Sequence, residues 1–417
     1  MKRFMQYKVF GCKTNKYFTE KWLSSGSLAD KKGMFIASCI VTDRAKSKWL
    51  KFVKDTISGF QTDDEKIYLS GCGTIKNGKL DENFYDIYPE LKEYKCKIVL
   101  LGEDPEKENT SIRLDSIKKR IIYTRKYLII QNGCDNYCTF CLTIQARGGH
   151  NSRDVDSIIS EIQDFSSSGG KEIVLTGTNI GAWGASDTKK FDESKLHELL
   201  EEILEKTTMP RIRISSLGIE YISERLLKIF SNPRIYPHFH LSIQSGSDKI
   251  LKSMNRNYSE KKLNEILERL NDLKRMDGIL PSIGADMIIG FPGESQEDFE
   301  KSLNLLEKYN ITKLHAFPFS SHKSHYSIPA GAFPNQIDDK IKRERMDVIG
   351  KEANRVRECF QKKNDGKSMN MLVEKIGDQT FSGWSENYIL LNQENFTPSD
   401  NQEIKRGNII EGIFNLK

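Results

Sequence analysis

Short apolar segments alternate with longer helical segments along most of this 417-residue chain. The first three segments typical of buried strands are QYKVFGC, GMFIASC and KIYLSGC. Between the last two, residues 42–60 favour a helix that begins at a capping Thr42. Strands that alternate with helices favour a parallel sheet, because each parallel pair needs a crossover connection. The alternation therefore predicts an α/β protein.

Each of these three strand segments ends in a cysteine: Cys12, Cys39 and Cys72. Parallel strands of an open sheet present their carboxyl ends along one edge, and ligands bind in the crevice there. We therefore expect the topology to bring the three thiols together, although tens of residues separate them. This predicts an N-terminal parallel-sheet α/β domain over residues 1–115 that gathers three thiols at one sheet edge.

Six further strand segments follow: KYLIIQNG, EIVLTGTN, RIRISSL, HFHLSIQ, GADMIIGFPG and KLHAFPFS. Helical segments with regularly spaced apolar residues lie between them, such as the one with Leu263, Ile266, Leu267 and Leu270. Six βα units in a row predict a central (βα)6 partial barrel over residues 120–350. Active sites of such folds gather at the carboxyl ends of the strands.

The last part of the chain, residues 353–417, predicts a small C-terminal β-barrel with a lead-in helix, because short strand segments alternate with turns. The helical stretch 340–363 holds nine cations against four anions. Such a run suits a solvated helix face as well as contact with nucleic acid. In the barrel, Trp384 and Tyr388 are expected either to stack on RNA bases or to pack internally.

Composition and the N-terminal segment suggest a cytoplasmic protein with no membrane contact. Apolar residues make up 37% of the chain, and no run is long enough to cross a bilayer. The start, MKRFMQYKVFGCKTN, lacks the apolar stretch of a signal peptide. In a reducing compartment, clustered cysteines indicate metal or redox chemistry rather than disulfides.

The segment GCDNYCTFC places Cys134, Cys138 and Cys141 directly after the first strand of the central series. Three thiolates with this spacing could bind zinc, with His150 as a fourth ligand, or a four-iron cluster. On a cluster they leave one iron open, and S-adenosylmethionine can bind there and be cleaved by an electron. The spacing C-x3-C-x2-C after a barrel strand favours this radical chemistry over zinc.

Nearly end to end, the chain resembles the methylthiotransferase family of radical S-adenosylmethionine enzymes. GCKTN, ASCIVT and SGCGTI look like the three cysteine motifs of its N-terminal domain. GCDNYCTFC with ARGGHNSR looks like the radical motif, and HLSIQSGSDKILKSMNR and GADMIIGFPGE resemble later barrel motifs. The C-terminal segment resembles the TRAM domain, an RNA-binding module.

The chain departs from the family pattern at two places. The second cysteine motif reads Ala-Ser-Cys, where the family usually has Asn-Thr-Cys. The loop SSHKSHYS, with His322, Lys323 and His325, stands where the family often has Ser-x-Arg-x-Gly-Thr. This loop leaves the choice of substrate open, but not the cluster chemistry.

The resemblance implies two 4Fe-4S clusters and S-adenosylmethionine. The implied ligands are Cys134, Cys138 and Cys141 for the radical cluster, and Cys12, Cys39 and Cys72 for the second cluster. The first would generate a 5′-deoxyadenosyl radical that removes hydrogen from the substrate. The second would carry the transferred sulfur, and a second S-adenosylmethionine would supply the methyl group. Glu172, Arg213 and Gln244 are expected to contact the cofactor.

The motifs GCKTNKYFTE, ARGGHNSR and LTGTNIGAWG look most like the branch that acts on threonylcarbamoyladenosine. The expected activity is insertion of a methylthio group at carbon 2 of this base, next to the anticodon of tRNA. Isopentenyladenosine of tRNA and an aspartate of a ribosomal protein are the alternatives within the family. A non-enzymatic, zinc-stabilised tRNA-binding protein is the alternative of another class. The expected partners of a monomeric enzyme are the tRNA anticodon loop and an electron donor.

Residues outside these motifs carry three further expectations. Cys96 and Cys359 are expected to be buried packing residues. Arg211 and Arg213 share one strand face, where they would either meet a carboxylate or phosphate or pair with acids of the barrel. His238 and His240 alternate along a strand, where they would contact substrate or form hydrogen bonds inside the barrel.

Overall fold

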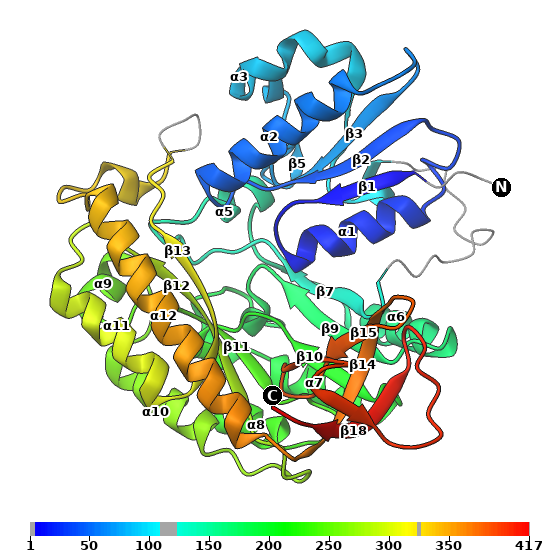
Figure 1. Cartoon of the computed structure of the whole chain (residues 1–417). Coiled ribbons are helices and arrows are strands. Elements are labelled where there is room, and N and C mark those ends of the chain that lie inside the picture. The colour runs from blue at the N-terminus through cyan, green and yellow to red at the C-terminus, as the bar shows by residue number, and fades with distance from the viewer. Residues whose placement is uncertain (1–4, 109–122, 323–326, 417) are drawn as a thin grey trace. The chain divides into compact units, whose positions relative to one another are not determined.

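The computed structural model describes residues 5–108, 123–322 and 327–416 (Figure 1). The described residues form two compact units that interleave along the sequence. The first unit comprises residues 5–108, 132–151, 320–322 and 327–332, and the second comprises 123–131, 152–319 and 333–416. The domain limits expected from the sequence stay a prediction. No helix in the described ranges is long and apolar enough to cross a membrane.

A four-stranded parallel sheet forms the centre of the first unit. Its strands lie in the order β1 (Gln6–Val9), β2 (Gly33–Ser38), β3 (Lys66–Gly71) and β6 (Ile98–Leu100). The segments between and after them are α1 (Lys13–Ser24), α2 (Asp43–Ser58), β4 (Ile75–Lys76), β5 (Lys79–Leu80), α3 (Phe84–Ile87), the 3-10 helix η1 (Pro89–Lys97) and α4 (Pro105–Glu108). The three predicted strands and their parallel pairing are confirmed.

Helix α2 shows why the local sequence folds as predicted. Its N-cap is Thr42, whose hydroxyl accepts a hydrogen bond from the backbone N–H of Ala45 at 3.1 Å. Farther along, Trp49 and Val53 are fully buried against the sheet, and they belong to one apolar cluster with Ile36 and Ile67. The cap and the apolar stripe together fix where this helix begins and which face it buries.

The prediction for Cys96 is wrong. Strand β6 begins only at Ile98, and Cys96 is exposed in the preceding η1. A 3-10 helix has three residues per turn, so the side chains of η1 do not continue the two-residue alternation of the strand, and Cys96 is turned to solvent. Cys359 is half-buried on the long C-terminal helix.

Two parallel sheets form the second unit. One has the strand order β10 (Arg211–Ile214), β9 (Glu172–Gly177), β7 (Lys126–Asn132) and β8 (Asn151–Ser152), and the other has β11 (His238–Gln244), β12 (Ser282–Ile289) and β13 (Ile311–Pro318). Single bridges, Ile212 to Ile235 and Leu217 to Leu241, link the two sheets. The helices between the strands are α6 (Val155–Ser167), α7 (Leu196–Lys206), α8 (Glu224–Phe230), α9 (Asp248–Ser253), α10 (Glu260–Asn271) and α11 (Gln296–Lys308). The predicted α/β class with parallel sheets is confirmed.

The chain ends in a curled antiparallel sheet of the second unit. Helix α12 (Asp339–Lys363) runs beside β13 and leads into this sheet (Figure 1). The strand order is β16 (Leu390–Asn392), β15 (Phe381–Trp384), β14 (Ser368–Ile376), β18 (Ile409–Phe414) and β17 (Phe396–Pro398). Fully buried Met371, Val373, Leu391 and Phe414 form its small apolar core.

Candidate functional site

The three N-terminal cysteines meet at the carboxyl edge of the first unit's sheet. Cys39 and Cys72 directly follow β2 and β3, and Cys12 comes three residues after the end of β1. Gly11, with φ +99°, makes the close approach possible, because a Cβ at this position would lie 2.9 Å from the Cys39 sulfur. The parallel topology therefore brings together thiols that are far apart in sequence.

Electrostatic coupling shows how near these thiols are to one another. Burial raises the pKa of Cys39 to about 11, and the charge of Cys12 raises it further. Burial also raises the pKa of Cys72 to about 12, to which Cys12 and Cys39 both contribute, while Arg147 opposes the rise. Only a bound cationic centre or nearby cations would make such thiols into thiolates, the form that binds iron.

One such cation is Arg147, the last residue of α5 (Thr143–Arg147) in the loop that carries the second cysteine trio. Its buried guanidinium donates from Nη2 to the Cys72 sulfur at 3.1 Å and to the Asn15 side-chain oxygen at 3.2 Å. Its Nη1 lies 2.5 Å from the Glu103 carboxylate. This arginine therefore connects the radical-motif loop with the N-terminal trio inside one compact unit.

Sequence reasoning gave no role to Asn15 or Glu103. The buried Asn15 amide donates to the carbonyl oxygens of Phe10 and Ser38, both at 2.7 Å, and so ties the ends of β1 and β2 together. Glu103 follows β6, the fourth strand, at the same sheet edge as the thiols. Because the carboxyl ends of parallel strands share one edge, the position of Glu103 after a strand could have predicted that it lies near the thiols.

The second trio lies on a loop that leaves β7, and Cys134 comes two residues after that strand. Backbone N–H groups point at two of its sulfurs: Asn136 donates to Cys134 at 3.5 Å, and Thr143 donates to Cys141 at 3.3 Å. Burial raises the pKa of Cys134 to about 12, and the charges of Cys141 and Cys138 add to the rise. Hydrogen bonds to ligand sulfurs are a means by which proteins adjust iron–sulfur clusters.

Spacing within the trios separates a cluster from a single zinc ion. Two ligands on one zinc, each about 2.3 Å from it, stand no more than about 4.6 Å apart. We looked among the described residues for three His, Cys, Asp or Glu side chains whose ligand atoms all lie within 4.8 Å of one another. One group meets this limit: His240, Asp286 and His315. The sulfurs of neither cysteine trio lie this close together, as binding to one ion would require. Thiolates on a four-iron cluster bind separate irons. Three thiol donors suit an iron–sulfur cluster that keeps one iron open.

The residues expected to contact the cofactor lie in the second unit. Glu172, at the start of β9, is fully buried, and its carboxylate contacts Arg125 at 3.1 Å, Arg211 at 2.7 Å and Arg213 at 3.0 Å. Of the alternatives for Arg211 and Arg213, the structure shows pairing with an acid of the parallel sheet. Gln244 ends β11 with a φ of +65°. The cofactor contacts of Glu172, Arg213 and Gln244 stay predictions.

The two arginines also attach the C-terminal sheet to the parallel sheet. Arg213 donates to the carbonyl oxygens of Ser385 at 2.7 Å and Glu386 at 2.9 Å. Arg211 donates to the carbonyl oxygen of Trp384 at 3.0 Å. The buried charges therefore hold together two elements of the second unit that are more than 170 residues apart in sequence.

Part of the departing loop SSHKSHYS lies in the first unit. His322 is buried, with its Nδ1 3.8 Å from an Asp43 oxygen, and Ser320 donates to the same carboxylate at 2.6 Å. Lys323 and His325 lie outside the described residues. Their influence on substrate choice stays a prediction.

The sequence model of the Radical SAM superfamily matches residues 128–306, which include the second trio. The threonylcarbamoyladenosine tRNA methylthiotransferase MtaB of Thermotoga maritima is 30% identical over 416 residues, covering 92% of this chain and 90% of that protein. The protein of the same name in Bacillus subtilis is 28% identical, covering 92% and 88%. The tRNA-2-methylthio-N(6)-dimethylallyladenosine synthase of Maricaulis maris is 29% identical, covering 89% and 86%.

Among solved structures, the radical S-adenosylmethionine methyltransferase TsrM of Kitasatospora setae matches with a TM-score of 0.50. It covers 79% of this chain and 77% of TsrM at 11% identity, so the match bears on the fold alone. The matching sequence model places this protein in the class of radical S-adenosylmethionine enzymes. The chain belongs to the methylthiotransferase family within this class, and its relatives indicate the threonylcarbamoyladenosine tRNA branch.

Proposed function

We propose that this enzyme inserts a methylthio group at carbon 2 of threonylcarbamoyladenosine, next to the anticodon of tRNA. The names of its relatives in Thermotoga maritima and Bacillus subtilis support the substrate. The observation that supports the chemistry is that both cysteine trios belong to one compact unit, in which Arg147 of the radical-motif loop donates to Cys72 of the other trio. Methylthiolation needs a radical and a sulfur source at one place, and this contact supports such a site.

Membership of the radical superfamily implies a 4Fe-4S cluster and S-adenosylmethionine. We infer two clusters, held by Cys134, Cys138 and Cys141 and by Cys12, Cys39 and Cys72. When bound, they supply the electron that cleaves S-adenosylmethionine and the sulfur that is transferred. In each trio the number of ligands leaves one iron open for an exogenous group.

The chain's own residues hold the two trios in place. Asn15 fixes the ends of β1 and β2, and therefore the positions of Cys12 and Cys39. The backbone N–H groups of Asn136 and Thr143 direct hydrogen bonds at the radical trio. The position of Gln244 at the carboxyl end of β11 supports its proposed contact with the cofactor.

The two parallel sheets are proposed to act as a (βα)6 partial barrel, since six strands in sequence order are linked by helices and single bridges join β10 to Ile235 and β11 to Leu217. The curled C-terminal sheet and the cationic α12 are proposed as the TRAM-like tRNA-binding part, which grips the anticodon loop. We also propose that the enzyme is a monomer and that it takes electrons from a separate protein.

The substrate is tested by nucleoside mass spectrometry of tRNA from cells with and without this protein. We expect loss of the methylthio form of threonylcarbamoyladenosine in its absence, and recovery with the wild-type chain but not with Cys39→Ala. The Maricaulis maris relative makes the dimethylallyl branch the second candidate. Loss of methylthio-isopentenyladenosine alone would assign the chain to that branch, and no change in either base would refute the function.

Arg147 offers a separate test of the second cluster. Replacing it with methionine removes a cationic donor 3.1 Å from the Cys72 sulfur. We expect the midpoint potential of the cluster on Cys72 to fall by about 60 mV or more, the equivalent of a tenfold change in a one-electron couple. Redox titration followed by electron paramagnetic resonance measures it. Arg44→Met, at an exposed site on α2, is the matched control.

A further inference from the structure

Two imidazoles and a carboxylate converge inside the second unit: His240 on β11, Asp286 on β12 and His315 on β13. The His240 Nε2 lies 2.9 Å from one oxygen of Asp286, and the His315 Nδ1 lies 3.3 Å from the same oxygen. The three ligand atoms all lie within 4.8 Å of one another. Two imidazoles and one carboxylate around one point are a common ligand set for a divalent transition-metal ion.

The register of the parallel sheet produces this convergence. Asp286 and His315 are direct partners across β12 and β13. On the other side of β12, His240 is the partner of Gly284. Gly284 stands two residues before Asp286, so the two residues belong to the same face of β12. The pairing of the strands therefore brings one residue from each of three strands to one face of the sheet.

Gly284 leaves the space that the ring of His240 occupies. A Cβ at position 284 would lie 2.6 Å from the His240 Nδ1 and 3.1 Å from atoms of the His238 ring. Glycine in the interior of a strand weakens the strand, and it often marks a position that another group approaches closely. Here the close groups are imidazoles, so the glycine allows His240 to reach Asp286.

A neighbouring hydroxyl orients the carboxylate of the group. Ser216 donates to the other oxygen of Asp286 at 2.9 Å, while the two imidazoles share the first oxygen. Hydrogen bonds of this kind hold ligating carboxylates in position. His238 does not join the group, because its Nδ1 lies 2.7 Å from the Ser282 hydroxyl. Within the described part of the chain, the group therefore offers three protein ligands.

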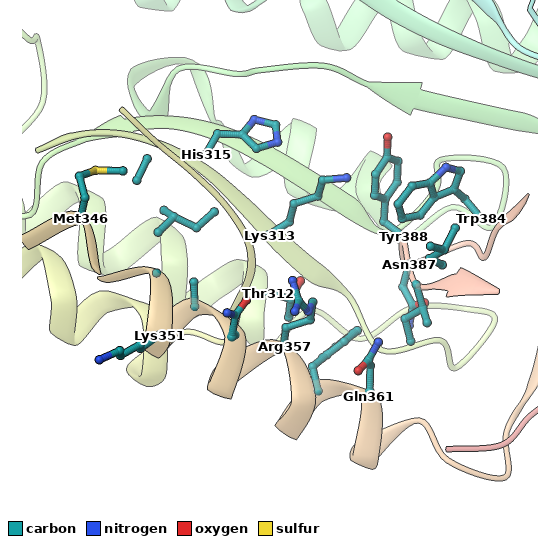
Figure 2. Close-up of a pocket in the computed structure, with 18 of the residues that line it drawn as sticks. Thr312, Lys313, His315, Met346, Lys351, Arg357, Gln361, Trp384, Asn387 and Tyr388 are labelled. Carbon is teal, nitrogen blue, oxygen red and sulfur yellow. The ribbon is translucent and has the colours of Figure 1, made fainter. Parts of the chain in front are cut away.

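A cavity of about 800 Å³ reaches this group at His315 (Figure 2). It lies between β13, α12 and the turn that joins β15 to β16, and both Lys313 and His315 line it. His240 is buried, whereas 46% of the His315 side chain is exposed. A metal ion with three protein ligands keeps a further coordination position for water or a ligand. At this group, the position would face a space that water and small ligands can enter.

We propose that His240, Asp286 and His315 bind a divalent transition-metal ion such as zinc. These ligands belong to the second unit, whereas both cysteine trios belong to the first, so the ion is distinct from the iron–sulfur centres. The inference rests on the ligand set and not on the proposed function. The competing account is a purely hydrogen-bonded group, in which protons and not an ion lie between the imidazoles and the carboxylate.

The test uses the whole chain with its iron–sulfur centres reconstituted, so that the cysteines are already occupied. After dialysis against micromolar ZnCl2 and gel filtration, metal analysis should find about one zinc ion per chain. Zinc X-ray absorption should show nitrogen and oxygen neighbours at about 2.0–2.2 Å and no sulfur at about 2.3 Å. The melting temperature of the wild type should rise with ZnCl2, because the ion binds the folded state.

Variants of the ligands distinguish the ion from the hydrogen-bonded group. His315→Ala should lower the zinc affinity by more than the roughly 10- to 100-fold that loss of an outer-shell partner costs, and Ser216→Ala should lower it by about that factor. His315→Cys should keep the zinc and add a sulfur neighbour at about 2.3 Å, which also shows that a variant at this position folds. His197→Gln removes a histidine of α7 outside the group and should bind zinc as the wild type does.

Three results would each overturn the inference. These are wild-type enzyme that retains no zinc, a wild-type spectrum with sulfur neighbours, and equal zinc affinity in wild type and His315→Ala. Sulfur neighbours would place the zinc at cysteines instead of at this group. None of these measurements uses tRNA, so a failure of the proposed function would leave their outcome unchanged.

Discussion

Replacing Cys138 by alanine is expected to reduce cleavage of S-adenosylmethionine by dithionite-reduced enzyme to the background of the assay, while tRNA binding is retained. Cys138 belongs to the trio in which it and Cys141 lie close enough to Cys134 to raise the pKa of that thiol. Two thiolates hold a four-iron cluster poorly, and no cofactor binds without its open iron. Release of 5′-deoxyadenosine measures cleavage, and a filter-binding assay with tRNA measures affinity.

The matched variant is Cys39→Ala in the other trio. It should keep cleavage of S-adenosylmethionine and lose methylthio transfer, because the thiol belongs to the centre that we propose as the sulfur source. Iron and acid-labile sulfide should fall by about half in each variant. Undiminished cleavage in Cys138→Ala would contradict the radical assignment, and methylthio transfer by Cys39→Ala would contradict the role of the second trio.

Replacing Glu172 by glutamine is expected to lower the free energy of unfolding of the second unit by about 3–5 kcal/mol, the usual loss when one partner of a buried charge network is removed. The carboxylate neutralises three arginines, two of which hold the C-terminal sheet. For a unit of this size the melting temperature should fall by roughly 6–20 °C. Differential scanning calorimetry measures both changes.

Glu224→Gln is the control, since this carboxylate pairs with Arg269 on the surface and should contribute less than about 1 kcal/mol. The pH dependence is a second check. Burial raises the pKa of Glu172, but Arg125, Arg213 and Arg211 outweigh it and lower the pKa to about 2. The contribution of Glu172 to the free energy of unfolding is therefore present above its pKa in the unfolded chain, about 4.3. It is lost as the pH falls through its pKa in the folded protein. A wild-type melting temperature as insensitive to acid as that of Glu172→Gln would contradict this account.

The sequence predicted features that depend on local patterns. Cys134, Cys138 and Cys141 lie within eight residues, so their spacing already defines a ligand set. Thr42 caps α2 as its residue type predicts. The alternation of strands with helices, together with the rule that parallel strands share one carboxyl edge, also brought Cys12, Cys39 and Cys72 together without any contact being known.

The sequence did not predict other features, because they depend on contacts between residues that are far apart in the chain. The cofactor contact of Glu172 stays a prediction, but its three arginine partners were not predicted, because one-dimensional patterns do not show partners from other segments. Cys96 seemed to start a strand, yet the 3-10 segment before β6 exposes it. The roles of Arg147 and Asp286 became visible only with their contacts.

By itself, then, the sequence determined the α/β class, the two cysteine trios and the family, because periodicity and short-range spacing survive in one dimension. The tertiary structure alone decided that Arg147 donates to Cys72, that buried arginines hold the C-terminal sheet, and that Lys313 and His315 face one cavity. The physical reason is register: a shift of one residue in a strand turns its side chains to the opposite face. Which charges meet is therefore fixed only when the sheets have formed.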